Sequence, residues 1–456
     1  MMSFVAEEFI SQDSYFLELF SDIKNVDTLS GVVLTSLTLG LAIARRVASD
    51  ILNQRSQAEN VRPLCPKCGR LLESKGMLPR SVISLIGPVN WKRRGWRCSK
   101  GCKIGQVTPF DKELGLQPNQ RMSNELKQIS CALAVFVPYS IASSLLKMLT
   151  GTKISSGAIW NWVQDAGQHA MIRLENELSA FDENFSESID IESKFQKLPL
   201  IIGGDGVMVP FRPHTGCPKG KTAWREIKVG IFARLCQGVT RKGKAVSVLV
   251  HRHLVAVLGN IDEFKVRMQV AAVKQGIMST EIVVWLSDGG RGFWGVYNEL
   301  FSGRAQGILD FYHAAQNIWK GTKNWLDGRT NKAREWFDKA RHRLRHGNAG
   351  KVIDDFQEGL IQDDLPESAR EEIKNVIEYL EKHKDHIQYD RYKELGLPIG
   401  SGMVESACKW LIQQRFKCVG MRWSEDGFNS LLHLRLAWVN GTFEELFVEA
   451  RLPPNS

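Results

Sequence analysis

Three acidic side chains, far apart in the chain, stand in surroundings suited to metal-ion chemistry. Asp205 follows the apolar run PLII and a Gly-Gly pair, Asp288 follows IVVWLS, and Glu405 lies near the start of a helix expected over 402–416. Carboxylates at the carboxyl end of a buried strand are costly to bury unless cations neutralise them. Two or three of them form an oxygen site suited to Mg²⁺ or Mn²⁺, which can activate a water or hydroxyl in phosphodiester chemistry.

Each acid also has a simpler interpretation when it is taken alone. An Asp-Gly pair after a strand, as at Asp205 and Asp288, is often only a turn. An acid in the first turn of a helix, as at Glu405, interacts favourably with the helix dipole. The joint occurrence of the three acids in this order favours the metal site. Apolar positions beginning with Val404 and Cys408 recur at helical spacing and predict a packed face beside Glu405.

Two close cysteine pairs, CPKC and CSKGC, supply Cys65, Cys68, Cys98 and Cys102. Four thiolates at this spacing predict a closed tetrahedral Zn²⁺ site, and four ordinary buried thiols are the alternative. The chain has nine cysteines in all, and an odd count argues for a reducing compartment rather than a disulfide framework. With no secretion signal visible, we expect a cytoplasmic protein. The pair His214 and Cys217 has ligand-like spacing but no visible second half.

The net charge of +10 and the pI of about 9.1 favour a polyanionic partner, with nucleic acid first and an acidic membrane surface second. A basic protein without such a partner is the alternative. Candidate DNA contacts fall in three places, each of which can also be an ordinary solvated surface. They are the hairpin-like stretch WKRRGWR, the basic stretch 329–347, and the segment after Glu405, with Lys92, Arg93, Arg94, Arg341, Arg345, Lys409, Arg415 and Arg422.

The elements that must position these residues change character along the chain. Strand patterns over 198–212, 225–235, 245–255, 281–290 and 306–311, with a helix over 260–276, predict an α/β mixed sheet with helices on both faces. Helices over 124–136, 140–151 and 155–170 have helix-turn-helix spacing. The run GVVLTSLTLGLAIARR is too short and too polar to span a membrane, and we interpret it as part of a core helix running to about Asn60.

These patterns divide the chain into seven parts. They are an N-terminal helical segment (1–60), a zinc ribbon (61–115), a helical DNA-binding region (116–190), the first part of a catalytic core (191–326), a helical insertion (327–396), the last core helix with a basic segment (397–440), and a tail (441–456).

The blocks IGGDGVMVPFR, REIKVGIFAR, WLSDGGRGFW, ILDFYHAAQNIW and IGSGMVESACKWLIQQRFKCVGMRW resemble bacterial insertion-sequence transposases with an RNase H-like DDE core. The Kra-type group, related to the Mutator-like transposases, is the most similar. The resemblance covers residues 198–440 in detail and the front end loosely. It implies that Asp205, Asp288 and Glu405 are the catalytic triad and that Asp310 and His313, in DFYH, are accessory. A helix cap with a satisfied histidine is the simpler interpretation of DFYH.

The resemblance implies a DNA transposase that binds transposon terminal inverted repeats and target DNA. Mg²⁺ or Mn²⁺ would serve strand cleavage and strand transfer, and Zn²⁺ would serve the front end. We expect a homo-oligomer associated with the nucleoid and no membrane partner. The alternative is a catalytically silent, sequence-specific DNA-binding protein derived from a transposase. A non-transposing nuclease of the same fold is a weaker third option.

Overall fold

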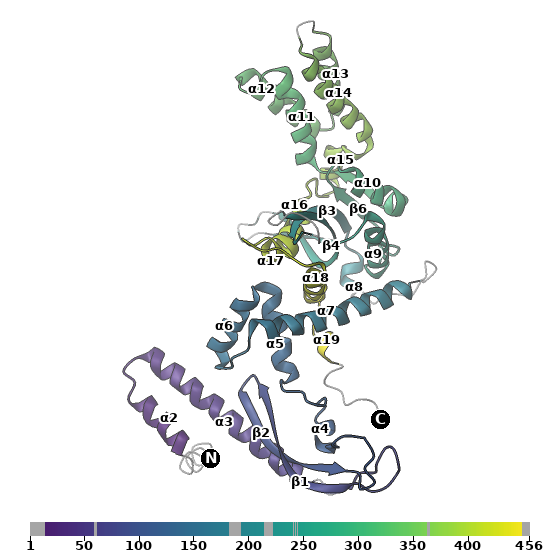
Figure 1. Cartoon of the computed structure of the whole chain (residues 1–456). Helices are drawn as coiled ribbons and strands as arrows, with labels where there is room; N and C mark the ends of the chain where they lie inside the picture. Colours follow the sequence, from purple (N-terminus) through teal and green to yellow (C-terminus); the bar gives the residue numbers. More distant parts are fainter. Residues whose placement is uncertain are drawn as a thin grey trace. The chain divides into compact units, whose positions relative to one another are not determined.

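The computed structural model describes residues 14–58, 62–181, 193–213, 222–239, 241, 243, 245–362 and 365–448. The chain forms two compact units, which are shown in Figure 1. One comprises Met1–His169 with Gly441–Ser456, and the other comprises Ala170–Asn440. The pair His214 and Cys217 and the end of the tail, 449–456, lie outside the described residues.

The described part of the first unit begins with two helices, α2 (Ser14–Lys24) and α3 (Leu29–Ala58). The expectation of a core helix was wrong, because only 11% of the apolar window of α3 is buried. By length and composition alone, Leu29–Gln57 could cross a membrane. Its second half instead packs on protein: Asn53 Oδ1 accepts a hydrogen bond from Lys92 N at 2.8 Å, and Ser56 Oγ donates to Lys92 O at 2.6 Å.

A long hairpin and four helices follow in the chain, and the last of these helices ends in the second unit. Strands β1 (Glu73–Ser84) and β2 (Gly87–Arg97) pair antiparallel. The short α4 (Pro109–Glu113) follows, and then α5 (Asn124–Phe136), α6 (Tyr139–Thr150) and α7 (Ser156–Ser179). The predicted helices over 124–136 and 140–151 are therefore present, and α6 ends at Gly151 in the left-handed conformation.

The second unit is built on a five-stranded mixed sheet, as predicted, in the order β5-β4-β3-β6-β7. Strands β3, β4 and β5 pair antiparallel, whereas β6 pairs parallel with β3 and β7 parallel with β6. β6 is buried along its whole length, which explains its unbroken apolar sequence. The strands span Leu200–Phe211 (β3), Ala223–Val239 (β4), Ala245–Val257 (β5), Val283–Ser287 (β6) and Gln306–Leu309 (β7).

Helices cover both faces of this sheet, and two adjacent glycines admit them. A Cβ on Gly203 would lie 2.5 Å from Val404 Cγ2 of α16 (Gly402–Cys408), whereas one on Gly204 would lie 2.8 Å from Phe293 Cδ1 of α10 (Arg291–Val296). Successive residues of a strand face opposite sides, so α16 and α10 lie on opposite faces. The helix α9 (Ile261–Lys274) shares the α10 face, because a Cβ on Gly230, paired with Gly204, would meet Met268 of α9.

The region predicted as a helical insertion is helical in its described residues. It extends from one end of the sheet in Figure 1. Its elements are α12 (Asn331–Arg345), α13 (Ala349–Leu360), α14 (Glu367–Lys382) and α15 (Tyr389–Glu394), with α11 (Phe311–Trp325) leading into it from β7. Phe356, Ile373 and Leu380 are buried in the same apolar core as the sheet. The insertion is thus packed as part of this unit.

The single helix predicted over 402–416 is interrupted. It consists of α16, a π-helical segment η3 (Lys409–Gln413) and α17 (Gln414–Phe416), and α18 (Glu425–Val439) follows. Val404 and Cys408 are buried, as their spacing predicted. A π-helical turn shifts the facing of the side chains after it and is often found at functional sites.

Gly203→Ala tests the close packing of α16 on β3. The new methyl would lie 2.6 Å from the Leu286 carbonyl oxygen, which belongs to a buried strand and cannot move aside freely. We expect the free energy of unfolding in urea to fall by about 1–3 kcal/mol. Gly295→Ala in α10 is the matched control, because nothing lies within 4 Å of the added methyl there. Equal stabilities for the two variants would contradict the packing.

Candidate active site and cysteine cluster

Three acidic residues lie at the same level of the sheet: Asp205 within β3, Asp288 directly after β6 and Asp310 directly after β7. The parallel ladder between β3 and β6 ends at the pair Ile202↔Trp285. Asp205 follows Ile202, and Asp288 follows Trp285, by the same number of residues. The ladder between β6 and β7 continues to the residues directly before Asp288 and Asp310. The sheet register alone therefore gathers the three carboxylates at one edge.

The structure corrects the placement of Asp205 at a strand end. Asp205 lies in the middle of β3, because β3 continues to pair with β4 as far as Phe211. It is nevertheless beyond the point where parallel pairing with β6 stops. Asp288 directly follows β6, as predicted. Asp205 shares the pleat face of Gly203, which is the face that α16 covers.

The helix α16 brings Glu405 and Cys408 to the same edge. Cys408 Sγ lies 4.0 Å from Asp205 Oδ2. Burial raises the pKa of Asp205, and the negative charges of Asp288 and Glu405 raise it further, while the Gly206 N–H and His313 act against the rise. Asp205 Oδ1 accepts that N–H at 2.7 Å. One electrostatic environment is thus shared by Asp205, Asp288 and Glu405, and a divalent cation there would relieve their repulsion.

Asp310 is buried and both of its carboxylate oxygens are engaged. Oδ1 caps α11 by accepting from His313 N at 2.7 Å and lies 3.1 Å from His313 Nδ1. Oδ2 accepts a hydrogen bond from Ser401 N, next to the start of α16. Burial raises the pKa of Asp310, but the hydrogen bonds from His313 and Ser401 outweigh it and hold the pKa at about 2. Asp310 therefore ties β7 to the segment that precedes Glu405.

The helical insertion also reaches this edge. The ring of Tyr379, on α14, packs on Gly289, where an added Cβ would lie 2.5 Å from the phenol oxygen. Burial raises the pKa of Tyr379, and the charges of Asp288 and Asp310 raise it further, so the phenol stays protonated. Sequence reasoning missed Tyr379 entirely and assigned Cys408 only to packing. The glycine after Asp288 was the one available signal, because it marks a close approach.

The carboxylates are less closely gathered than the cysteines. Among the described residues, only one set of three or more His, Cys, Asp or Glu has all its ligand atoms within 4.8 Å of one another, and it is the cysteine set. Asp205, Asp288 and Glu405 would thus have to draw together around an ion. The acids have the oxygen donors that Mg²⁺ prefers.

The cysteine set consists of Cys65, Cys68, Cys98 and Cys102, which come from two turns at one end of the hairpin. Cys68 Sγ lies 3.6 Å from Cys98 Sγ, close to the edge of about 3.8 Å that Zn–S bonds of 2.3 Å imply for a tetrahedron. Gly69 and Gly101 take positive φ angles of 69° and 70° and let the backbone fold around the thiols. The cluster is compatible with zinc binding.

Two of the predicted DNA contacts are corrected by their burial. Arg93 is 8% exposed, and its Nε lies 3.1 Å from both carboxylate oxygens of Asp111, so it is part of the hairpin's own packing. Arg415 is 1% exposed and packs over the Trp423 ring. The spacing of basic residues cannot distinguish these from surface positions. The others are exposed or half-buried: Lys92, Arg94, Arg341, Arg345, Lys409 and Arg422.

Comparison with known proteins gives a family match for the second half of the chain. Residues 275–448 match the model of an uncharacterised protein family, UPF0236, in a range that includes Asp288, Asp310 and Glu405. The chain is also 28% identical over 372 residues to a Streptococcus gallolyticus protein named "UPF0236 protein in vanSb 3'region". That alignment covers 80% of this chain and 74% of the relative.

Among solved structures, the Drosophila P element transposase strand transfer complex is similar at 10% sequence identity. The match covers 75% of this chain and 84% of that chain, with a TM-score of 0.24. A TM-score of this size does not establish a shared fold, and it carries no functional weight.

Zinc content tests the cysteine cluster. We expect about one zinc ion per purified chain, because four thiolates complete a tetrahedral shell. Cys98→Ser removes one ligand, and its zinc content should fall well below that of the parent when both are measured by atomic emission. Cys236→Ser, on β4, is the control and should retain the metal. Equal zinc in both variants, or none in the parent, would contradict a zinc site.

The Asp310–His313 pair predicts a particular pH dependence of stability. The pKa of His313 is raised, mainly by its hydrogen bond with Asp310. The contribution of His313 to the free energy of unfolding is therefore complete below the ordinary pKa of about 6.5, and it is lost as the pH rises through the raised pKa. Asp310 has a lowered pKa, so its contribution holds above about 3.9 and is lost as pH falls toward 2.

Asp310→Asn should therefore cost roughly 2 kcal/mol at pH 6. It should also flatten the decline in stability between pH 6 and pH 9. Urea unfolding across this range measures both effects. Asp338→Asn is the control, because the Asp338 side chain is 68% exposed. A parent and an Asp310→Asn variant with parallel pH profiles would show that the pair does not titrate as described.

Proposed function

We propose that this protein is a DNA transposase of an insertion sequence, with an RNase H-like catalytic core in its second unit. The observation that carries the proposal is the alignment of Asp205 and Asp288 at one level of adjacent strands, with Glu405 delivered to the same edge by α16. The order of these acids along the chain, and the motifs around them, are those that the resemblance to DDE transposases implies. The mixed sheet with helices on both faces is the scaffold expected for it.

Asp205, Asp288 and Glu405 would hold Mg²⁺ or Mn²⁺, which when bound supplies an activated water or hydroxyl and stabilises the leaving oxygen of a phosphodiester. Asp310 is already engaged by His313 and Ser401, and its role is to hold the segment before α16 in place. Asp310 raises the pKa of His313, which favours the protonated imidazole. A protonated His313 near Asp288 and Glu405 would place a positive charge beside the scissile phosphate.

The first unit would bind transposon ends. The hairpin presents Lys92 and Arg94 outside its packed core, and α5, α6 and α7 supply the three helices of the predicted helix-turn-helix. Zinc on the four cysteines would fix the turns at one end of the hairpin. In the second unit, DNA phosphates would be contacted by Arg341 and Arg345 on α12 and by Lys409 and Arg422 beyond Glu405. A cytoplasmic homo-oligomer on the nucleoid completes the proposal.

Loss of single carboxylates tests the catalytic assignment. Asp205→Asn, Asp288→Asn and Glu405→Gln should each lower Mg²⁺-dependent cleavage by at least about 100-fold, because each removes a ligand charge. The substrate is a labelled duplex that carries the end of the element flanking the reading frame. Asp354→Asn, an exposed acid on α13, should cleave at the parent rate.

End binding, measured by gel shift, should be unchanged in all four variants. Full cleavage by any of the three site variants would refute the assignment of that acid. Binding without cleavage by the parent in either Mg²⁺ or Mn²⁺ would favour a silent, transposase-derived DNA-binding protein. Cleavage without joined products would favour a nuclease.

A further inference from the structure

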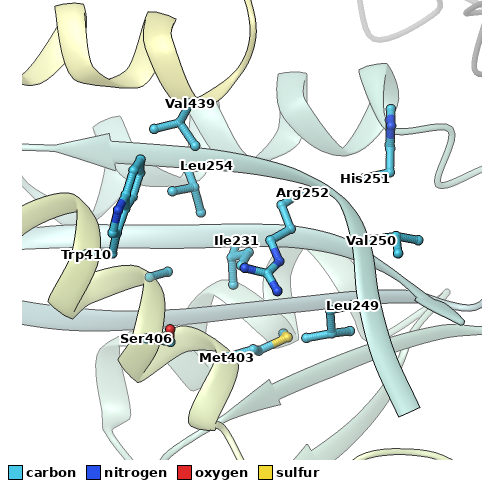
Figure 2. Close-up of a pocket in the computed structure, with 11 residues that line it drawn as sticks. Ile231, Leu249, Val250, His251, Arg252, Leu254, Met403, Ser406, Trp410 and Val439 are labelled. Carbon is cyan, nitrogen blue, oxygen red and sulfur yellow. The ribbon is translucent and has the colours of Figure 1, made fainter. Parts of the chain in front are cut away.

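A cavity of about 770 Å³ lies on the α16 face of the sheet, beside the candidate active site. Strands β4 and β5 form one wall, and α16, η3 and the end of α18 form the other, as Figure 2 shows. Its apolar lining includes Ile231, Leu254 and Val439. The polar groups include Arg252 and Ser406, and Ser406 directly follows Glu405 in the chain. The cavity and the candidate active site thus share one helix.

An irregularity in β5 directs Arg252 into this cavity. His251 has a φ of 47°, a left-handed conformation that is unusual for a residue other than glycine, and the register between β4 and β5 shifts at the same place. His251 stacks on Phe195, with ring centroids 4.9 Å apart, and points away from the other lining side chains in Figure 2. The guanidinium of Arg252 extends between the strands and α16. Such a local strain is a mark of functional sites.

The charge on Arg252 is available for a ligand. No described residue forms an ion pair or hydrogen bond with its side chain. On the opposite wall, Trp410 stands in the π-helical segment η3 and borders the cavity. Arg435 supports Trp410 from the protein interior, 5.4 Å from the ring centroid, and donates to the Trp410 carbonyl oxygen at 2.7 Å. The cavity therefore offers a held aromatic ring, an unpaired cation and a hydroxyl.

We propose that this cavity binds one unpaired nucleotide of the DNA strand that passes the acidic edge. The base would stack on Trp410, the phosphate would pair with Arg252, and Ser406 would hydrogen-bond a base edge or a phosphate oxygen. Aromatic stacking accepts every base, and an arginine pairs well with phosphate. The volume exceeds that of one nucleotide, and the apolar floor suits a base removed from its stack.

This inference rests on the proposed function, since it assigns DNA to the same helix that carries Glu405. It adds that the strand is held single-stranded beside the acids. Binding of the nucleotide would fix the position of the neighbouring phosphate relative to Glu405, because Ser406 and Glu405 are consecutive residues of α16. A duplex would have to open locally to enter the cavity, so single-stranded DNA should bind better there.

Photocrosslinking of the full chain tests the proposal. The probe is a ten-nucleotide oligodeoxythymidylate with one 5-iodouracil, irradiated without divalent metal, and the crosslinked peptide is identified by mass spectrometry. We expect the peptide that contains Trp410. Arg252→Gln and Trp410→Ala should each weaken binding of the oligonucleotide about 10-fold by fluorescence anisotropy. Trp410→Phe retains a ring and should restore most of the affinity.

Arg241→Gln is the matched control, because Arg241 is an exposed arginine in the turn between β4 and β5. It should bind within about twofold of the parent. Crosslinks elsewhere, together with parental affinity in Arg252→Gln, would overturn the proposal even if Trp410→Ala fails to fold. A parent that cleaves DNA without crosslinking at Trp410 would reject this cavity alone. Crosslinking at Trp410 in a parent that does not cleave would support the cavity and reject the transposase.

Discussion

The close approach of α16 to β3 over Gly203 is the contact on which the candidate active site depends. Any side chain at Gly203 would meet Val404 and the Leu286 carbonyl oxygen, so the helix could not sit at this depth. At this depth α16 places Cys408 4.0 Å from Asp205 and brings the charge of Glu405 to bear on it. Glu405, which is 200 residues from Asp205 in the chain, thereby joins the acids at the sheet edge. Bringing α16 to β3 closes a long loop, which costs conformational entropy. Packing of the apolar, buried side of α16 offsets this cost.

Two further contacts connect other parts of the chain to the candidate active site. Asp310 links β7 to the segment before α16 through Ser401, and Tyr379 packs the insertion on Gly289 beside Asp288. The insertion thus packs against the acidic edge through Tyr379. Three parts of the chain with different architectures (the sheet, the insertion and the segment after it) are required to assemble one site. Each supplies a contact that is either a glycine without room for a side chain or a buried hydrogen bond.

Much of this arrangement was predictable from local patterns. The apolar runs before Asp205 and Asp288 predicted buried strands, and the spacing of Val404 and Cys408 predicted the packed face of α16. The paired cysteines predicted a cluster, which the structure forms. These predictions succeed because period, turn residues and ligand spacing are encoded within a few residues.

The sequence-based predictions were wrong where tertiary contacts determine the position or the burial of a residue. Arg93 and Arg415 resemble surface cations in sequence, but Asp111 and Trp423 bury them. The helix α3 was predicted to be a core helix because its composition is apolar, but composition does not show whether other elements pack over it. Gly289 was the one available signal for Tyr379, and the bulge that directs Arg252 had none, since both depend on strands and helices distant in the chain. The strand pattern over 198–212 did predict that β3 continues past Asp205, and only the placement of Asp205 at a strand end was wrong.

We propose that the sheet edge and α16 together hold a divalent ion. Anomalous diffraction from crystals soaked in Mn²⁺ measures this directly. We expect a strong anomalous peak about 2.1 Å from carboxylate oxygens of Asp205 and Asp288, with Glu405 drawn toward it or toward a second peak. A map without a peak at this edge, under conditions in which the protein cleaves DNA, would contradict a metal site there.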